Sequence, residues 1–151
     1  MPSVFDKLNL KQQREILVVN APSSFERELT ALEGVVVIRD PKKAKAVHFA
    51  LAFATRQAEV DALSQILADK AEGDALLWFA YPKGTSKRYK CEFNRDTGWN
   101  TIRGAGFDTV RQVAIDGDWS ALRFRRLEYI KPSPSGTSRN PAAANDRARG
   151  R

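Results

Sequence analysis

An uninterrupted apolar run near the middle of the chain is the feature that most limits how this sequence can fold. The stretch from Asp74 to Lys83 is Asp-Ala-Leu-Leu-Trp-Phe-Ala-Tyr-Pro-Lys. A short run that is apolar on both faces is typical of a parallel strand covered on both sides of an α/β sheet. Pro82 has no amide hydrogen for a sheet ladder, so we expect the strand to end there. Lys83 and Gly84 would then lie at its carboxyl end, where open α/β sheets bind ligands.

Apolar runs and helix signals on either side of this stretch predict an α/β domain. Ser23 and Glu26 have the spacing of a capping box at the start of a helix. Asp116-Gly117 is typical of a turn between antiparallel strands, and the alternation after it predicts an edge strand with one wet face. The expected strands are 15–19, 35–38, 47–53, 74–82, 109–115 and 120–127, and the expected helices are 23–33, 41–46, 55–72 and 94–103.

This order of elements predicts a Rossmann-like three-layer sandwich. Helices separate the first five strands, so the six-stranded sheet is expected to be parallel up to its last strand, with right-handed crossovers. A C-terminal antiparallel hairpin closes the sheet. The closing hairpin makes the expected topology more similar to a degenerate class I methyltransferase than to a dehydrogenase, a comparison that says little about activity.

Length and composition fit one globular domain, residues 1–131, followed by a basic tail. The chain has 151 residues, of which 42% are hydrophobic and 28% are charged, as in ordinary globular proteins with one core. From Pro132 onward no large apolar residue occurs, so residues 132–151 are predicted to be disordered. The net charge of +7 comes partly from this tail and partly from loops, which is more typical of a solvated surface than of specific recognition.

A single cysteine and the lack of a long apolar run indicate a cytoplasmic protein. Cys91 alone can form neither an intrachain disulfide nor a cysteine-based metal cage. No segment of the sequence approaches the roughly 20 apolar residues that span a bilayer, and the amino terminus does not resemble a signal peptide. We therefore expect a cytoplasmic location and no membrane partner.

The first strand-to-helix turn, where a Rossmann-like fold holds a nucleotide, contains no glycine. Residues 20–25 are Asn-Ala-Pro-Ser-Ser-Phe, and Pro22 also removes a backbone donor. This composition argues against binding a dinucleotide or S-adenosylmethionine in the usual way. Asp40 follows Asn20 by twenty positions, where an acidic residue can hold a ribose. Because Asp40 precedes Pro41, it can also cap a helical turn, and we favour this interpretation.

The loop after Pro82 is basic, but it does not match a known phosphate-binding motif. Lys83, Lys87, Arg88 and Lys90 surround a Gly-Thr-Ser segment, whereas a P-loop requires Gly-x-x-x-x-Gly-Lys. A solvated loop explains these charges more simply than an anion site does.

Few residues are suited to catalysis. His48, the only histidine, lies inside an apolar run and is expected to be packed in the core. Cys91 has basic neighbours that would lower its thiol pKa, but no partner base is apparent. Arg95 can reach the strand ends, and Trp119 is expected to plug the end of the core. No triad, carboxylate pair or metal-ligand spacing occurs in the sequence, so no catalytic residue and no metal site are assigned.

Three segments resemble a small bacterial domain family of unknown function. They are residues 77–83, 94–96 and 115–126, and the most specific part is an Asp-x-x-Trp-Ser-x-Leu-basic-Phe strand. The resemblance extends over most of residues 8–127. It implies a Rossmann-like, methyltransferase-shaped fold that has lost its glycine-rich loop, and it implies no known reaction. The residues that match the family pattern are Pro82, Lys83, Arg95, Trp119 and Arg123.

Three functions are open, and we favour the first. It is a non-catalytic Rossmann-like domain without a cofactor, binding a small anionic ligand or a protein partner at the carboxyl ends of the strands. The alternative is an S-adenosylmethionine-dependent methyltransferase-like enzyme with an atypical, glycine-free loop. The third is weak, non-specific nucleic-acid binding through the basic loop and tail. The candidate ligand-binding residues are Asn20, Asp40, Pro82, Lys83, Arg95 and Trp119.

Overall fold

The computed structural model describes residues 4–130, so the predicted tail, 132–151, lies outside the described residues. The strands are β1 (Glu15–Val19), β2 (Val36–Ile38), β3 (Val47–Phe53), β4 (Ala71–Pro82), β5 (Phe107–Ala114) and β6 (Trp119–Arg126). The α-helices are α1 (Val4–Lys7), α2 (Glu26–Thr30), α3 (Gln57–Lys70) and α4 (Asn100–Gly104), and the 3₁₀ turns are η1 (Ser23–Phe25), η2 (Pro41–Lys43) and η3 (Leu127–Tyr129).

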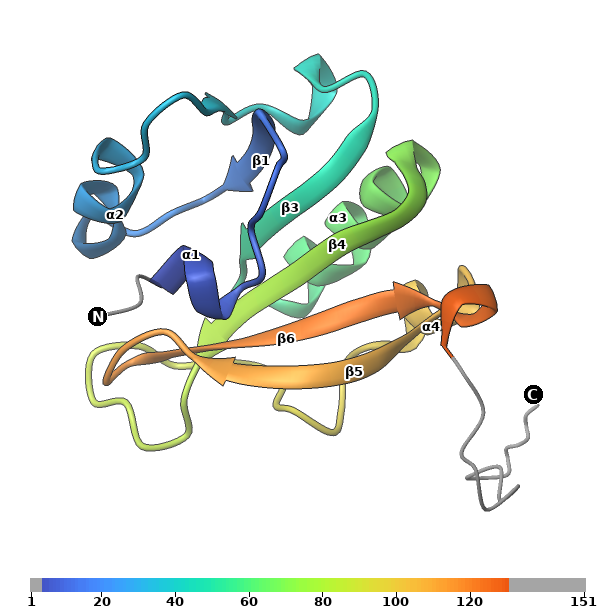
Figure 1. Cartoon of the computed structure of the whole chain (residues 1–151). Helices are drawn as coiled ribbons and strands as arrows, with labels where there is room; N and C mark the ends of the chain where they lie inside the picture. The colour runs from blue at the N-terminus through green and yellow to red at the C-terminus, as the bar shows by residue number, and fades with distance from the viewer. Residues whose placement is uncertain (1–3, 131–151) are drawn as a thin grey trace.

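All six strands form one mixed sheet in the order β2-β1-β3-β4-β6-β5 (Figure 1). The pairs among β1, β2, β3 and β4 are parallel, and β6 is antiparallel to both β4 and β5. The predicted Rossmann-like α/β fold, with a mostly parallel sheet and a closing antiparallel hairpin, is therefore confirmed.

β4 lies inside the sheet and is buried on both faces, as the apolar run predicted. Every residue from 75 to 82 is buried, and residues 77–80 have no exposed surface. β3 and β6 satisfy its two ladders. Each large apolar side chain that is fully buried contributes about 1.5–3 kcal/mol, so this strand anchors the packing on both sides of the sheet.

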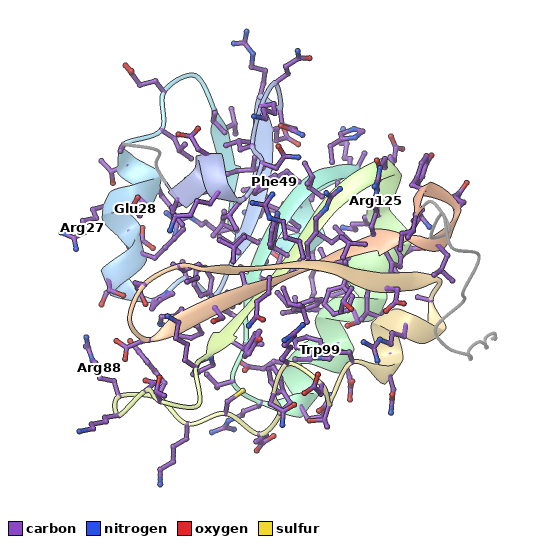
Figure 2. The ribbon with its side chains drawn as sticks, turned by 60° about the horizontal axis from the view of Figure 1, so that its bottom comes forward. Arg27, Glu28, Phe49, Arg88, Trp99 and Arg125 are labelled. Carbon is purple, nitrogen blue, oxygen red and sulfur yellow. The ribbon has the colours of Figure 1, made fainter. Side chains whose placement is uncertain are left out.

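Alternation along β4 directs its side chains into two separate layers. Phe79 faces α3 and α4, where its ring centroid lies 5.6 Å from that of Trp99. Trp78 faces the amino-terminal segment, and its Nε1 donates to the carbonyl oxygen of Leu8 at 2.9 Å. Figure 2 labels Phe49 and Trp99, which belong to the two different layers and lie on opposite sides of the sheet.

The position of β6 differs from the prediction. The alternating segment 120–127 was expected at the edge of the sheet, but β6 lies between β4 and β5, and β5 is the outer strand. The alternation itself is present, because Leu122 and Phe124 are buried while Arg123 and Arg125 remain partly exposed on the other face. Alternation therefore indicated a partly wet face, which an inner strand also has where helices do not cover it.

The opposite edge of the sheet and the cap of α3 also differ from the sequence prediction. The four consecutive apolar residues at 35–38 are typical of a buried strand, but β2 is an edge strand and Val36 is 60% exposed. The helix predicted at 55–72 begins only at Gln57, because Arg56 and not Thr55 is its cap. The carboxylate of Glu59 accepts from the backbone N–H of both residues at 3.0 Å, which satisfies two donors at the start of the helix.

The helix predicted at 23–33 is shorter in the structure, and its capping box does not form. η1 is capped by Pro22, without a side-chain hydrogen bond, and α2 ends at Thr30. The carboxylate of Glu26 instead accepts two hydrogen bonds from Arg39, each at 2.8 Å. A stronger charge-assisted partner has therefore replaced the local cap.

The helix predicted from residue 94 begins only at Asn100. The side-chain oxygen of Asn94 accepts from the backbone N–H of Asp96 at 2.7 Å and of Thr97 at 3.0 Å, which folds these residues into a turn. Gly98 follows with a φ of +95°, a left-handed conformation that other residues adopt at a cost.

Replacing Gly98 by alanine should destabilise the domain. An added Cβ would lie 2.6 Å from Cβ of Phe93 and 2.7 Å from Oε1 of Gln57. We expect the free energy of unfolding in urea to fall by about 2–3 kcal/mol, because steric overlap adds to the unfavourable φ. The matched control is Gly84→Ala, whose added Cβ meets nothing within 4 Å and should change stability by at most about 0.5 kcal/mol. Equal stabilities for the two variants would contradict this prediction.

Candidate ligand-binding site

The chain order reverses between β1 and β3, which makes this the topological switch point of the sheet. From β1 the chain moves outward to β2 and then returns to β3 on the other side of β1. Open α/β sheets bind ligands at the carboxyl ends of the strands at such a point. Asn20 follows β1 with a φ of +59°, and its Nδ2 donates to the carbonyl oxygen of Phe53 at 3.5 Å. This long hydrogen bond connects the carboxyl ends of the two strands.

Aromatic rings of the chain itself occupy the switch point. Phe25, on the glycine-free turn, is 3% exposed, and its ring centroid lies 5.1 Å from that of Phe53. Phe53 lies 5.1 Å from Trp119, and Tyr89 covers Trp119 at 4.9 Å. Phe5 of α1 packs on Phe25 at 5.7 Å. The space at the end of β1 is therefore filled, and Trp119 is buried at the end of the core as expected.

Asp40 caps the turn that follows β2. Its Oδ1 accepts from the backbone N–H of Lys42 at 2.9 Å, and Pro41 occupies the first position of the turn. This geometry agrees with the interpretation of Asp40 as a capping residue.

A concave region at the carboxyl end of β4 forms a second candidate site, which we call the basic cleft. Its volume is about 760 Å³. Of the predicted site residues, Pro82, Lys83 and Arg95 line this cleft, and the other three do not. The lining residues are Tyr81, Pro82, Lys83, Gly84, Thr85, Ser86, Tyr89, Lys90, Cys91, Phe93, Asn94, Arg95, Gln112 and Ser120.

Hydrogen bonds hold the loop after β4 in a defined shape. The backbone N–H of Lys83 donates to the carbonyl oxygen of Asp118 at 2.7 Å, and Ser86 Oγ donates to Asp118 Oδ1 at 2.9 Å. The backbone N–H groups of Arg88 and Tyr89 donate to Ser86 Oγ at 3.3 and 3.2 Å. The loop is thus tied to the β5–β6 turn, and Figure 2 shows Arg88 at its outer end.

A buried indole fixes the backbone beside Arg95. Trp99 is 1% exposed, and its Nε1 donates to the carbonyl oxygens of Asn94 and Arg95 at 2.9 and 3.0 Å. Arg95 itself is exposed at the cleft. Its backbone is therefore anchored to the core while its guanidinium group remains available to a ligand.

The basic cleft combines unpaired cations with a buried phenol. Lys83, Lys90 and Arg95 form no ion pair with any residue of 4–130. The hydroxyl of Tyr81 accepts from Nε2 of Gln112 at 2.9 Å. Burial raises the pKa of Tyr81, and the positive charge of Arg95 opposes this shift only in part. The phenol is therefore protonated at neutral pH and can donate a hydrogen bond to an anion that the cations attract.

Cys91 does not have the lowered thiol pKa that was expected from its basic neighbours. Burial raises its pKa; a backbone hydrogen bond at Phe93 opposes the shift, and the carboxylates of Glu92 and Glu59 add to it. Desolvation disfavours the thiolate more than the backbone hydrogen bond favours it. Cys91 is thus a protonated thiol in the wall of the cleft.

His48 is exposed, so its predicted place in the core is wrong. Its side chain is 59% accessible, and its Nε2 lies 3.8 Å from Oε1 of Glu72. The strand alternates there, since Val47 and Phe49 on either side are buried. Within residues 4–130, no group of three His, Cys, Asp or Glu side chains is placed to hold a metal ion. No helix in the same range has the length and apolarity needed to cross a bilayer.

Gln112 and Ser120 line the basic cleft but were not singled out from the sequence. They reach it because Gln112 pairs with Leu122 and Ser120 pairs with Tyr81 across the ladders. The register of β5 shifts between Thr109 and Arg111. A shift of one residue moves side chains to the opposite face of a sheet, so the face on which Gln112 lies could not be predicted. The only sequence signal for Gln112 and Ser120 was that they are polar residues within predicted strands.

The order of the six strands and the closing antiparallel hairpin match a methyltransferase-like Rossmann fold. Similar solved structures include an S-adenosylmethionine-dependent methyltransferase from Aquifex aeolicus (TM-score 0.57, 13% identity, 82% of this chain and 88% of that one). Others are the N-methyltransferase NodS from Bradyrhizobium japonicum WM9 (0.51, 11%, 80% and 90%) and LepI in complex with SAM (0.52, 10%, 81% and 38%). No protein-family model and no curated protein matches the sequence. The likeness at these identities is one of fold.

The thiol of Cys91 should react slowly in the folded protein. Because its pKa is raised, the thiolate fraction at pH 8 is smaller than in an unfolded chain, and burial limits access as well. We expect iodoacetamide to label the native protein at least about tenfold more slowly than a peptide of residues 88–94. The pH midpoint of labelling should also lie higher than in the peptide. Equal rates would show that burial does not control this thiol.

Proposed function

We propose that this methyltransferase-shaped domain binds a small organic anion in the basic cleft and does not catalyse a reaction there. The observation that carries the proposal is the set of three cations, Lys83, Lys90 and Arg95, that lack ion-pair partners within residues 4–130 and surround one concave surface. The carboxyl end of β4 is also where α/β sheets present ligands to their loops.

The lining of the cleft favours an anion with an apolar body. The rings of Tyr81 and Phe93 lie 6.1 Å apart, and both are largely buried, so they form an apolar wall. The hydroxyl of Tyr81 and the amide of Gln112 add two polar groups. Such a mixture of apolar wall and few polar groups is typical of small-molecule sites. Lys83 and Arg95 supply the attraction for a carboxylate or phosphate.

The chemistry of the cleft supports binding rather than catalysis. The pKa of Cys91 and that of Tyr81 are both raised by burial, so neither group is a strong nucleophile or base at neutral pH. General acid–base work is most efficient when the pKa lies near the operating pH. The cleft therefore resembles a receptor for an anion more than a reaction centre.

A second candidate function, S-adenosylmethionine-dependent methyl transfer, is favoured by the fold comparisons. The similar solved structures include two methyltransferases and a complex with SAM, and this likeness supports the second candidate better than the first. The contacts at the switch point oppose it. Phe25 and Phe53 fill the space at the end of β1, and Asp40 is engaged as a cap. As this turn stands, its residues do not fit the cofactor.

Four further properties of the protein are expected from its sequence. Membership of the bacterial domain family with the Asp-x-x-Trp-Ser-x-Leu strand is one. A protein partner at the same cleft, weak nucleic-acid contact through the basic loop, and a cytoplasmic location are the others. Each stays a prediction.

Calorimetry with S-adenosylmethionine and a panel of small carboxylates and phosphates tests the two functions. We expect one or more of the anions to bind the full chain, and the double variant Lys83→Ala/Arg95→Ala to lose at least about tenfold in affinity, because charged hydrogen bonds contribute about 1.5–3 kcal/mol each. The control Arg27→Ala/Lys45→Ala removes the same charge from two exposed positions outside the cleft and should bind normally.

The outcome for S-adenosylmethionine separates the candidates. Asp40→Asn keeps a capping side chain, since asparagine is an equally good cap, but removes the carboxylate that a ribose would need. Tight binding of S-adenosylmethionine that is lost in Asp40→Asn and kept in Lys83→Ala/Arg95→Ala would favour methyl transfer and overturn the anion proposal.

A further inference from the structure

Two arginines face each other across the β5–β6 ladder. Arg111 and Arg123 are Cα partners in this antiparallel pair, so their side chains lie on one face with Cβ atoms about 5 Å apart. We call them the arginine pair. Arg125, two residues further along β6, lies on the same face and is labelled in Figure 2. Like charges placed directly opposite each other destabilise a sheet.

The carboxylate of Asp74, which lies beside Arg123, is already hydrogen-bonded to Arg125. Arg125 donates from Nε and Nη2 to the two carboxylate oxygens of Asp74 at 2.8 and 2.6 Å. The ion pair between Nη2 of Arg123 and Asp74 Oδ1 is long, at 3.9 Å. Arg111 forms no ion pair within residues 4–130. Once Arg125 and Asp74 neutralise each other, the arginine pair retains two positive charges.

Arg123 is poorly compensated where it lies. Its side chain is 14% exposed, and its Nε is buried with no acceptor among the described residues. Burial lowers the pKa of Arg123, the charges of Arg125 and Arg111 lower it further, and Asp74 opposes the shift. A poorly compensated charge in a partly buried place is destabilising, so an anion held beside these guanidinium groups would stabilise the protein.

Packing explains only part of this arrangement. Arg123 is the cross-strand partner of the fully buried Trp78, and an arginine stem is well suited to cover an indole. That role does not require a second arginine opposite it. Arg111 is exposed, so the pair is open to solvent on one side.

We propose that Arg111 and Arg123 bind the phosphate group of a small phosphomonoester. A phosphate near −2 charge matches two adjacent guanidinium groups, whereas a carboxylate carries charge for only one. Two guanidinium forks present paired N–H donors to phosphate oxygens. The charge of the phosphate then offsets the repulsion between the two guanidinium groups across the ladder.

The surroundings favour one phosphate group over a long polyanion. Glu72 and Asp74 line a shallow cleft at the amino-terminal part of β4, next to the end of the arginine face where Asp74 pairs with Arg125. These carboxylates interrupt the basic surface and repel a continuous phosphate backbone.

The arginine pair is separate from the basic cleft. Successive residues of a strand point to opposite faces, so Arg111 and Gln112 face different sides of the sheet. Gln112 lines the basic cleft, and neither Arg111 nor Arg123 does. The phosphate site therefore does not depend on the proposed function of that cleft.

The test measures inorganic phosphate binding to the full chain by NMR and by thermal unfolding. We expect phosphate and sulfate, but not acetate or chloride at the same ionic strength, to raise the unfolding temperature and to shift the Nε–H resonance of Arg123. Arg111→Gln should weaken phosphate binding at least tenfold. Arg123→Lys keeps the charge but loses the fork, and should weaken it as well.

Two single-charge controls give the comparison. Arg27→Gln, on α2 (Figure 2), and Lys45→Gln, an exposed position outside the basic cleft, should bind phosphate at the arginine pair as the unaltered chain does. The proposal is overturned if phosphate acts no more strongly than acetate or if Arg111→Gln leaves binding unchanged. It is also overturned if Arg95→Gln abolishes the response, which would assign the ion to the basic cleft, or if a single-stranded oligonucleotide binds and phosphate does not.

Discussion

Burial of β4 on both faces is the constraint on which the rest of this structure depends. A strand that is apolar at every position from 75 to 82 must be covered on each side, and α3 with α4 cover one face while the amino-terminal segment covers the other. The strand stops at Pro82, which pairs with Trp119 in the last step of the ladder with β6. The chain is therefore released into a loop at one fixed point, and that loop forms the basic cleft.

The need to bury apolar side chains also explains why the accessible site is the basic cleft at the end of β4 and not the switch point between β1 and β3. A turn with glycines leaves backbone exposed to a nucleotide, whereas residues 20–25 bring Phe25 into contact with Phe53 and Phe5. Ring pairs of this kind add about 0.5–1.5 kcal/mol each beyond their burial. A ligand at the end of β1 would have to displace them, while the carboxyl end of β4 remains concave and open.

The sequence predicts the sheet better than it predicts the site, and the reason is physical. Hydrophobic periodicity is local, so the strand at 47–53 was found with its exact limits and β4 with its carboxyl end. The choice of interaction partners is not local. Glu26 accepts a hydrogen bond from Arg39 instead of forming the predicted capping box. The edge strand is β5, although the alternating pattern had predicted β6 at the edge. A register shift in β5 places Gln112 in the basic cleft and Arg111 on the opposite face of the sheet. Such a shift cannot be predicted from the amino-acid composition of a strand.

Charge is distributed by this register, and it has consequences for ligand binding. One face of the β5–β6 hairpin contributes Gln112 and Ser120 to the basic cleft, while the other presents Arg111 and Arg123. Each site has its own excess of positive charge, and the sheet lies between them, so an anion at one cannot neutralise the other by contact. Arg111 and Gln112 are consecutive residues of β5, so the strand backbone connects the two sites, and Asp118 in the hairpin turn is hydrogen-bonded to the loop of the cleft. If the hairpin is rigid, the anion affinities of the two sites are independent. If it twists when an anion relieves the repulsion between the arginines, binding at one site changes the affinity of the other.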